Sequence, residues 1–184
     1  MSIVCPWWLG WLLASPIRKI WQDPARILVP HVREGMTVLE PGPGMGFFTL
    51  ELARRVGPAG RVVAVELQPR MLAGLRRRAE RAGLAGRVVT RLARKDSLGV
   101  DDLAGTVDLV LAFAVVHELP DAARFFAELR ATLAPGGVVL LAEPTGHVKP
   151  AEFEKTLGAA ARAGLRREPG PAIARSLTAL LVAA

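Results

Sequence analysis

The stretch "VLEPGPGMGFFTLELA" (residues 38–53) decides how this sequence folds. It is a short apolar run that ends on Glu40, continues through Gly42, Gly44 and Gly46, and opens into an amphipathic segment. This order predicts a buried strand, a glycine turn and the start of a helix. Glycines let a backbone turn sharply and approach a ligand closely, and the free N–H groups at a helix N-terminus can hold a carboxylate. The stretch therefore predicts a ligand site at its turn.

Valine- and leucine-rich runs recur along the rest of the chain and alternate with longer amphipathic segments. The apolar runs predict strands at 36–40, 61–66, 87–92, 107–113 and 137–143. The amphipathic segments predict helices at 46–56, 69–83, 121–133 and 150–163. Continuous apolar strands separated by helices are typical of a parallel sheet that is covered on both faces. We therefore expect an α/β, doubly wound fold.

The length of the chain and its C-terminal segment bear on the domain organisation. At 184 residues with 51% hydrophobic content, the sequence is long enough for one domain and too short to suggest two. Residues 164–184 contain two strand-like runs around "EPGP", which could form an antiparallel hairpin at the sheet edge. We expect a helical lid at residues 1–30, followed by a single globular unit at residues 31–184.

The N-terminal segment is apolar and rich in tryptophan. Its apolar run, residues 3–14, is too short to span a bilayer and has no basic region before it. Four tryptophans near basic residues could instead lie at a membrane surface. A lid packed on the domain is favoured, because a helix that is hydrophobic on most sides is usually buried. The single cysteine, Cys5, excludes an internal disulfide framework and fits a cytoplasmic location.

The spacing around the glycine turn indicates the ligand. A dinucleotide-binding turn has the pattern G-x-G-x-x-G, but counted from Gly42 the third glycine comes one residue early, at Gly46. Glu66 ends the second predicted strand, where an acid accepts hydrogen bonds from ribose hydroxyls. Glu40 would suit a cationic group such as an ammonium. The pattern implies adenosine without pyrophosphate, and S-adenosylmethionine meets these demands.

The segments that carry this pattern resemble the motifs of class I S-adenosylmethionine-dependent methyltransferases. "VLEPGPGMG" is similar to the first motif of that family, "VVAVELQPRML" to its second-strand motif and "LAPGGVVLLAE" to the turn into its fifth strand. "VDLVLAFAVVHELPD" agrees in order and spacing. The resemblance is strongest to the small-molecule type of ubiquinone/menaquinone biosynthesis and arsenite methyltransferases. It implies a Rossmann-like, seven-stranded, mostly parallel sheet with an antiparallel last strand.

The resemblance also assigns residues to the cofactor. It implies that Glu40 and the three glycines surround the methionyl part of S-adenosylmethionine and that Glu66 holds the ribose. It further implies that Leu67 packs against adenine, while Asp96 and Ser97 face the adenine amine. A role in a turn is the alternative for Asp96, because aspartate often serves turns.

The residues for the methyl acceptor are sought after the fourth and fifth strands. Methyl transfer from a sulfonium is an in-line displacement, so an enzyme must chiefly align a nucleophile and exclude water. His117 could contact the cofactor or act as a general base, with Glu118 orienting it. Glu143 and His147 could join it at the strand ends. Capping, packing and turn roles remain open for these residues, and no motif predicts a metal site.

These features favour S-adenosylmethionine-dependent methyl transfer to a small, partly apolar acceptor. The sequence has no Asn/Asp-Pro-Pro-aromatic motif of the amino-group methyltransferases, and its single cysteine argues against a metalloid substrate. Two alternatives remain open. The first is an RNA methyltransferase, motivated by the arginines between residues 76 and 91, although such runs are usually solvated helix faces. The second is a protein that binds S-adenosylmethionine without catalysis.

Overall fold

The structure is a computed structural model that describes residues 22–94 and 96–184. The four tryptophans, Cys5 and most of the predicted lid at residues 1–30 lie outside the described residues. Seven strands form a sheet in the order β3-β2-β1-β4-β5-β7-β6. The described residues group into two compact units, 22–93 and 94–184, which we call the N-terminal unit and the C-terminal unit. Each unit is described by itself below.

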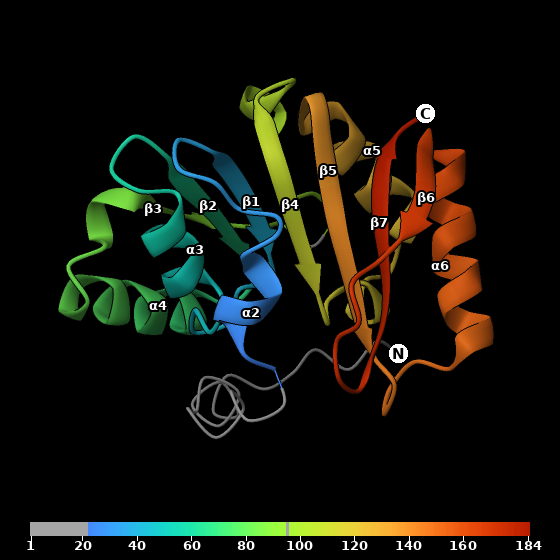
Figure 1. The fold of residues 1–184 in the computed structure, drawn as a ribbon, viewed down its shortest axis with the longest axis horizontal. Helices are drawn as coiled ribbons and strands as arrows, with labels where there is room; N and C mark the ends of the chain where they lie inside the picture. Colours follow the sequence, from blue (N-terminus) through green and yellow to red (C-terminus); the bar gives the residue numbers. More distant parts are fainter. Residues whose placement is uncertain (1–21, 95) are drawn as a thin grey trace. The chain divides into compact units, whose positions relative to one another are not determined.

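The N-terminal unit contains three parallel strands, three α-helices and one 3₁₀ turn, η3 (Ala85–Arg87) (Figure 1). Its elements are α2 (Pro24–Leu28), β1 (Thr37–Pro41), α3 (Thr49–Arg55), β2 (Arg61–Glu66), α4 (Pro69–Arg81) and β3 (Val88–Leu92). The sheet register pairs Val38 with Val62 and Val63 with Val89. Nearly every residue of β1 and β2 is buried. Because successive side chains of a strand point to opposite faces, both faces of these strands are covered.

Helix α4 shows how the sequence determines the helices of this unit. Pro69 stands at its first turn, where a missing N–H costs nothing. Its apolar residues recur at helical spacing and are buried, whereas Arg76 and Arg77 lie on the exposed side. Gly83, with a φ of +68°, follows its C-terminus. The predicted helix at 69–83 is thus confirmed, two residues shorter at its end.

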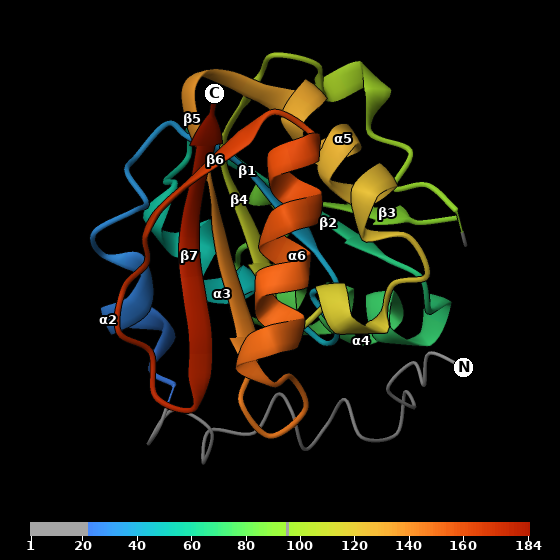
Figure 2. The same ribbon diagram turned by 90° about the vertical axis from the view of Figure 1, so that its right-hand side faces the viewer.

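The C-terminal unit contains the remaining four strands. Its elements are the 3₁₀ turn η4 (Asp101–Leu103), β4 (Val107–Phe113), the 3₁₀ turn η5 (Val116–Glu118), α5 (Ala122–Thr132), β5 (Leu133–Pro144), α6 (Pro150–Arg162), β6 (Leu165–Pro169) and β7 (Ser176–Ala183). Strands β4 and β5 are parallel, and β7 pairs antiparallel with both β5 and β6. Helices α5 and α6 lie side by side, and α6 packs on β6 and β7 (Figure 2). The predicted antiparallel last strand is confirmed.

The largest differences from the predicted boundaries lie at the starts of α3 and β5, and both involve glycine. Helix α3 begins at Thr49 instead of residue 46, because Gly46 has a φ of +82° and still belongs to the turn. Strand β5 begins at Leu133, before the Pro-Gly-Gly sequence that was expected to precede it. The register shifts there, since Val107 pairs with Leu133 and Leu109 with Val138. The turn residues are absorbed as a bulge in a longer strand.

The sheet confirms the α/β fold with seven mostly parallel strands. Within the described part of the chain, no helix is both long and apolar enough to cross a bilayer.

Candidate active site

The glycine turn follows β1 in the N-terminal unit and is held by its own backbone. The Gly42 N–H donates to the Val65 carbonyl at 2.9 Å, and the Gly46 N–H donates to the Pro43 carbonyl at 2.9 Å. Gly42, Gly44 and Gly46 have φ values of +69°, +55° and +82°. Residues with side chains rarely adopt this left-handed conformation. The backbone path therefore favours glycine at all three positions.

The glycines differ in what surrounds them. A Cβ atom built at Gly44 would meet no heavy atom within 4 Å, so open space lies beside this residue. A Cβ atom at Gly46 would overlap the Leu75 Cδ1 methyl group of α4. Gly46 is buried, whereas Gly42 is exposed. Gly44 thus leaves room for a ligand, and Gly46 lets the turn pack closely on α4.

Glu66, the last residue of β2, is only 8% exposed and has a fixed orientation. One carboxylate oxygen accepts from the Gly44 N–H at 3.1 Å, and the other accepts from the Gln68 N–H at 3.0 Å. A carboxylate offers about four lone-pair positions. These two bonds therefore fix the direction of the carboxylate at the end of β2, the position where the ribose of the cofactor is expected.

Glu40 is a second buried carboxyl group in this unit, 4% exposed at the end of β1. It accepts a hydrogen bond from the Thr49 hydroxyl at 2.6 Å. Burial raises the pKa of Glu40 to about 7; the Thr49 hydrogen bond lowers it, and the negative charge of Glu66 raises it further. A ligand cation beside Glu40 would relieve this cost. A ligand that combines a ribose with positive charges therefore fits the residues present, as S-adenosylmethionine does.

The predicted adenine contacts fall in different surroundings. Leu67 is 38% exposed and offers an accessible apolar side chain directly after Glu66. Asp96, in the C-terminal unit, has a side chain that is 72% exposed and lies 3.8 Å from Arg124. Ser97 donates through its hydroxyl to Glu128 of α5 at 3.3 Å.

Glu128 holds the loop that contains Ser97, a role that no pattern in the sequence indicates. Its carboxylate accepts from the Leu98 N–H at 2.7 Å as well as from the Ser97 hydroxyl. The side chain of Glu128 is 17% exposed and also lies 3.5 Å from Arg124. A contact between residues about 30 positions apart leaves no local pattern in the sequence, so only the fold could identify it.

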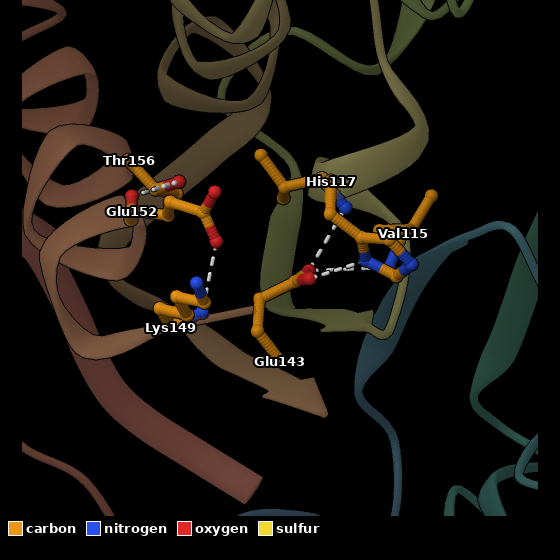
Figure 3. A network of polar contacts seen from close by, with 7 residues as sticks. Val115, His117, Glu143, Lys149, Glu152 and Thr156 are labelled. Carbon is orange, nitrogen blue, oxygen red and sulfur yellow. Dashed lines mark hydrogen bonds and ion pairs between the residues drawn. The ribbon is translucent and has the colours of Figure 1, made fainter. Parts of the chain in front are cut away.

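A carboxylate and an imidazole meet at the ends of β4 and β5 in the C-terminal unit (Figure 3). Glu143 is 1% exposed. One of its oxygens accepts from the Val115 N–H at 3.2 Å and the Val116 N–H at 2.9 Å, and the other contacts His117 Nδ1 at 2.5 Å. Ala114, with a φ of +54°, turns the chain into this arrangement. The buried carboxylate thus holds both the η5 backbone and the histidine ring.

The contact with Glu143 determines the state of His117. An ionised carboxylate only accepts hydrogen bonds, so His117 Nδ1 carries the proton and Nε2 is the second ring nitrogen that can accept one. The hydrogen bond to Glu143 raises the pKa of His117, burial opposes it, and the charges of Glu143 and Glu118 raise it further. The side chain remains 23% exposed. The Nδ1 partner is therefore Glu143, where the sequence had suggested Glu118.

His147 completes the set of acceptor-site candidates. It is exposed, and its ring centroid lies 5.7 Å from that of His117 at an interplanar angle of 51°. The structure thus brings His117, Glu143 and His147 together. Figure 3 also shows that α6 begins close by, where the Lys149 N–H donates to Glu152 at 2.9 Å. Across residues 22–94 and 96–184, no group of three or more metal-ligating side chains is arranged to hold an ion.

Comparison with known proteins agrees with this geometry. The family model described as "Methyltransferase domain" matches residues 38–137, which is more than half of the chain. A solved S-adenosylmethionine-dependent methyltransferase from Aquifex aeolicus superposes with a TM-score of 0.84 over 97% of this chain and 100% of its own, at 24% identity. The chain therefore belongs to the methyltransferase domain family. The match places it among class I S-adenosylmethionine-dependent methyltransferase domains, the family whose cofactor is S-adenosylmethionine.

Two curated relatives show how far the likeness extends. The ribosomal protein L11 methyltransferase of Pelotomaculum thermopropionicum is 39% identical over 62% of this chain, which covers 34% of that protein. The ubiquinone/menaquinone biosynthesis C-methyltransferase of Pasteurella multocida is 30% identical over 72% of this chain, which covers 48% of that protein. This chain thus spans between a third and a half of each relative.

Proposed function

We propose that this protein transfers the methyl group of S-adenosylmethionine to a small, partly apolar acceptor. The observation that carries the proposal is the pair formed by Glu143 and His117. A buried carboxylate that fixes the ring and the tautomer of a partly exposed histidine is an arrangement suited to proton transfer. The likeness to a protein named as a ubiquinone/menaquinone biosynthesis C-methyltransferase supports an acceptor of the proposed kind.

In this proposal His117 acts on the proton of the acceptor. When bound, S-adenosylmethionine would supply a methyl group on a positively charged sulfur; an aligned nucleophile would attack the methyl carbon in line, and the sulfur would leave as a neutral thioether. His117 Nε2, unprotonated in the neutral ring, takes the proton that the acceptor loses as it attacks. Glu143 stabilises the resulting imidazolium and keeps the ring oriented. His147 would contact the acceptor beside His117.

A pH–rate profile tests this assignment. Because the Glu143 contact raises the pKa of His117, the base form appears only above that raised pKa, and activity should rise with pH through it. The Glu143→Gln variant should shift this rise to lower pH and reduce kcat/KM by about 10²-fold. Formation of S-adenosylhomocysteine would be followed with a panel of phenols, quinols, thiols, amines and carbon acids. An unchanged profile in Glu143→Gln would overturn the role of His117.

The same panel separates catalysis from simple binding. Tight binding of S-adenosylmethionine measured by calorimetry, combined with no turnover of any acceptor, would favour a protein that binds the cofactor without catalysis.

A nucleic-acid acceptor is the second candidate, and the position of the positive charge favours it. Residues 67–94 contain eight arginines and a single acidic residue, Glu80. The formal charge of this segment, +7, equals the net charge of the whole chain. This segment comprises α4 and the edge strand β3. Affinity for RNA should then fall steeply as salt is added. RNA binding that does not change with salt concentration, or no RNA binding, would leave the small-molecule acceptor as the better proposal.

The N-terminal residues 1–30 form a lid over the acceptor in this proposal, and the lone cysteine supports a cytoplasmic location. Deleting residues 1–14 should reduce acceptor turnover while binding to anionic vesicles, if there is any, remains unchanged. Loss of vesicle binding with normal turnover would instead assign the segment to peripheral membrane contact.

A further inference from the structure

Helix α4 packs against the back of the glycine turn through three neighbouring residues. Leu75 occupies the position that a Cβ atom of Gly46 would need. Gly74 faces the Met45 side chain, whose Cγ would lie 3.1 Å from a Cβ atom built at Gly74. Arg78 donates from its guanidinium to the Met45 carbonyl at 2.5 Å. Because residues three and four apart share one face of a helix, these three residues form a single contact surface.

The Arg78 contact holds one particular peptide group of the turn. The Met45 carbonyl and the Gly46 N–H belong to the same peptide plane. Arg78 binds the carbonyl end of this plane, and the Pro43 carbonyl accepts from its N–H end at 2.9 Å. Met45 is only 3% exposed, so its carbonyl would cost free energy if it were left without a donor. The peptide plane is thereby fixed at both ends.

The Arg78 guanidinium is partly shielded from solvent in this contact. Burial lowers the pKa of Arg78. In contrast, the adjacent Arg77 is exposed on α4. The two neighbouring arginines thus offer a matched pair, one held against the turn and one facing solvent.

We infer that Arg78 is a positioning residue for the cofactor site. It holds the Met45–Gly46 peptide, and through it the turn in which the Gly44 N–H meets Glu66 and open space lies beside Gly44. A turn that is already in its binding conformation loses less entropy when a ligand binds. Arg78 therefore raises the affinity for S-adenosylmethionine from behind the turn. This role is independent of the methyl acceptor.

Equilibrium binding to Arg78→Met tests the inference directly. The variant should bind S-adenosylmethionine about tenfold more weakly, as expected for loss of one charge-assisted hydrogen bond. Arg78→Lys keeps a charged donor and should recover part of the affinity. Arg77→Met, the control, should bind within about twofold of the original protein, because an exposed substitution away from the turn changes little. The dissociation constants would be measured by calorimetry.

Two further readouts separate positioning from other roles of Arg78. S-adenosylhomocysteine has no sulfonium charge, so a pure positioning effect weakens both ligands by the same factor. A direct charge effect would instead make Arg78→Met favour S-adenosylmethionine over S-adenosylhomocysteine. Residue-resolved hydrogen exchange of the ligand-free protein should show faster exchange at Gly46 in Arg78→Met, with no change at the β2 amides.

The same measurements have results that would refute the positioning role of Arg78. Unchanged affinity in Arg78→Met, or equal exchange at Gly46, would show that the contact does not position the turn. If Arg78→Met does not fold, Arg78→Lys decides: weakened binding of both ligands supports positioning, and original affinity with original Gly46 exchange refutes it. Failure of the acceptor proposal would leave these results untouched, because they are obtained without any acceptor.

Discussion

Two buried glutamates at strand ends, one in each unit, are held in opposite ways. Glu143 is 1% exposed and receives hydrogen bonds from two backbone N–H groups and His117. Glu40 is 4% exposed and receives one from Thr49, while the nearby charge of Glu66 raises its pKa. The protein thus satisfies Glu143 with its own groups and leaves Glu40 costly to ionise.

We infer from this difference that Glu143 maintains local structure, whereas Glu40 binds a cationic ligand. A carboxylate surrounded by hydrogen-bond donors holds the residues around it in place. A buried carboxylate with few donors is instead stabilised in its ionised form when a cation binds beside it. Removing Glu143 should therefore damage the fold locally. Removing Glu40 should help the ligand-free fold and harm cofactor binding.

The largest effect on stability is expected for Glu143→Ala. The Val115 and Val116 N–H groups and the His117 ring would lose their common acceptor, so unfolding should cost about 3 kcal/mol less than in the original protein. Urea denaturation measures this change. The control is Glu154→Ala, which removes an exposed ion pair with Arg167 and should change stability by less than about 1 kcal/mol. Equal effects in both variants would contradict the central role of Glu143.

Gly44→Val should reduce affinity for S-adenosylmethionine by about 100-fold, because it fills the open space and strains a left-handed residue. Gly83→Val provides the control, since Gly83 has a similar φ of +68° and open space but follows α4 away from the turn. Calorimetry on both variants separates the effects. If the two variants bind equally well, the open space at Gly44 is not part of the cofactor site.

Glu40→Gln should have opposite effects on stability and on binding. In the folded protein the pKa of Glu40 is raised from 4.5 to about 7. The stability contributed by the protonated Glu40 is therefore fully present below pH 4.5 and is lost as the pH rises through 7. At pH 8 the variant should therefore be more stable by on the order of 2 kcal/mol, with little difference at pH 4.5. It should also bind S-adenosylmethionine more weakly at pH 8, having lost the negative charge.

The affinity of the original protein supplies the matching pH test. Binding a cation beside Glu40 favours the ionised form, so affinity for S-adenosylmethionine should increase as pH rises through about 7. Glu80→Gln, which removes an exposed acid from α4, serves as the control and should keep this pH dependence. A flat affinity profile in the original protein would mean that Glu40 does not face the cationic part of the ligand.

The strands could be predicted closely because burial on both faces leaves an unbroken apolar run. The predicted ranges 61–66 and 107–113 coincide with β2 and β4. The starts of α3 and β5 could not be predicted from the sequence, because both depend on positive φ values at glycines, which composition does not reveal. Helix and strand interiors are encoded locally, but these boundaries depend on the path of the backbone.

The same distinction applies to the candidate site. The order acid, glycines and second acid lies within a short stretch, so Glu40, Gly44 and Glu66 could be proposed as neighbours from sequence. The pairing of His117 with Glu143 joins residues 26 positions apart, and that of Arg78 with Met45 joins residues 33 apart. Glu118, adjacent to His117 in sequence, was the obvious partner until the strand ends were placed. Contacts of this kind follow from topology alone.

The smallest effect is expected for Asp96→Asn, which tests the predicted adenine contact. Asp96 is 72% exposed and its pairing with Arg124 spans 3.8 Å, so the substitution should change stability by less than about 1 kcal/mol. If Asp96 accepts a hydrogen bond from the adenine amine, affinity should still fall by about threefold to tenfold, the range expected for one hydrogen bond. Arg130→Gln, a charge change on α5, provides a control for general charge effects. Because asparagine retains a carbonyl acceptor, Asp96→Ala should weaken binding further than Asp96→Asn. Identical affinities in all three variants would remove Asp96 from the cofactor site and leave Ser97, held by Glu128, as the polar candidate in that loop.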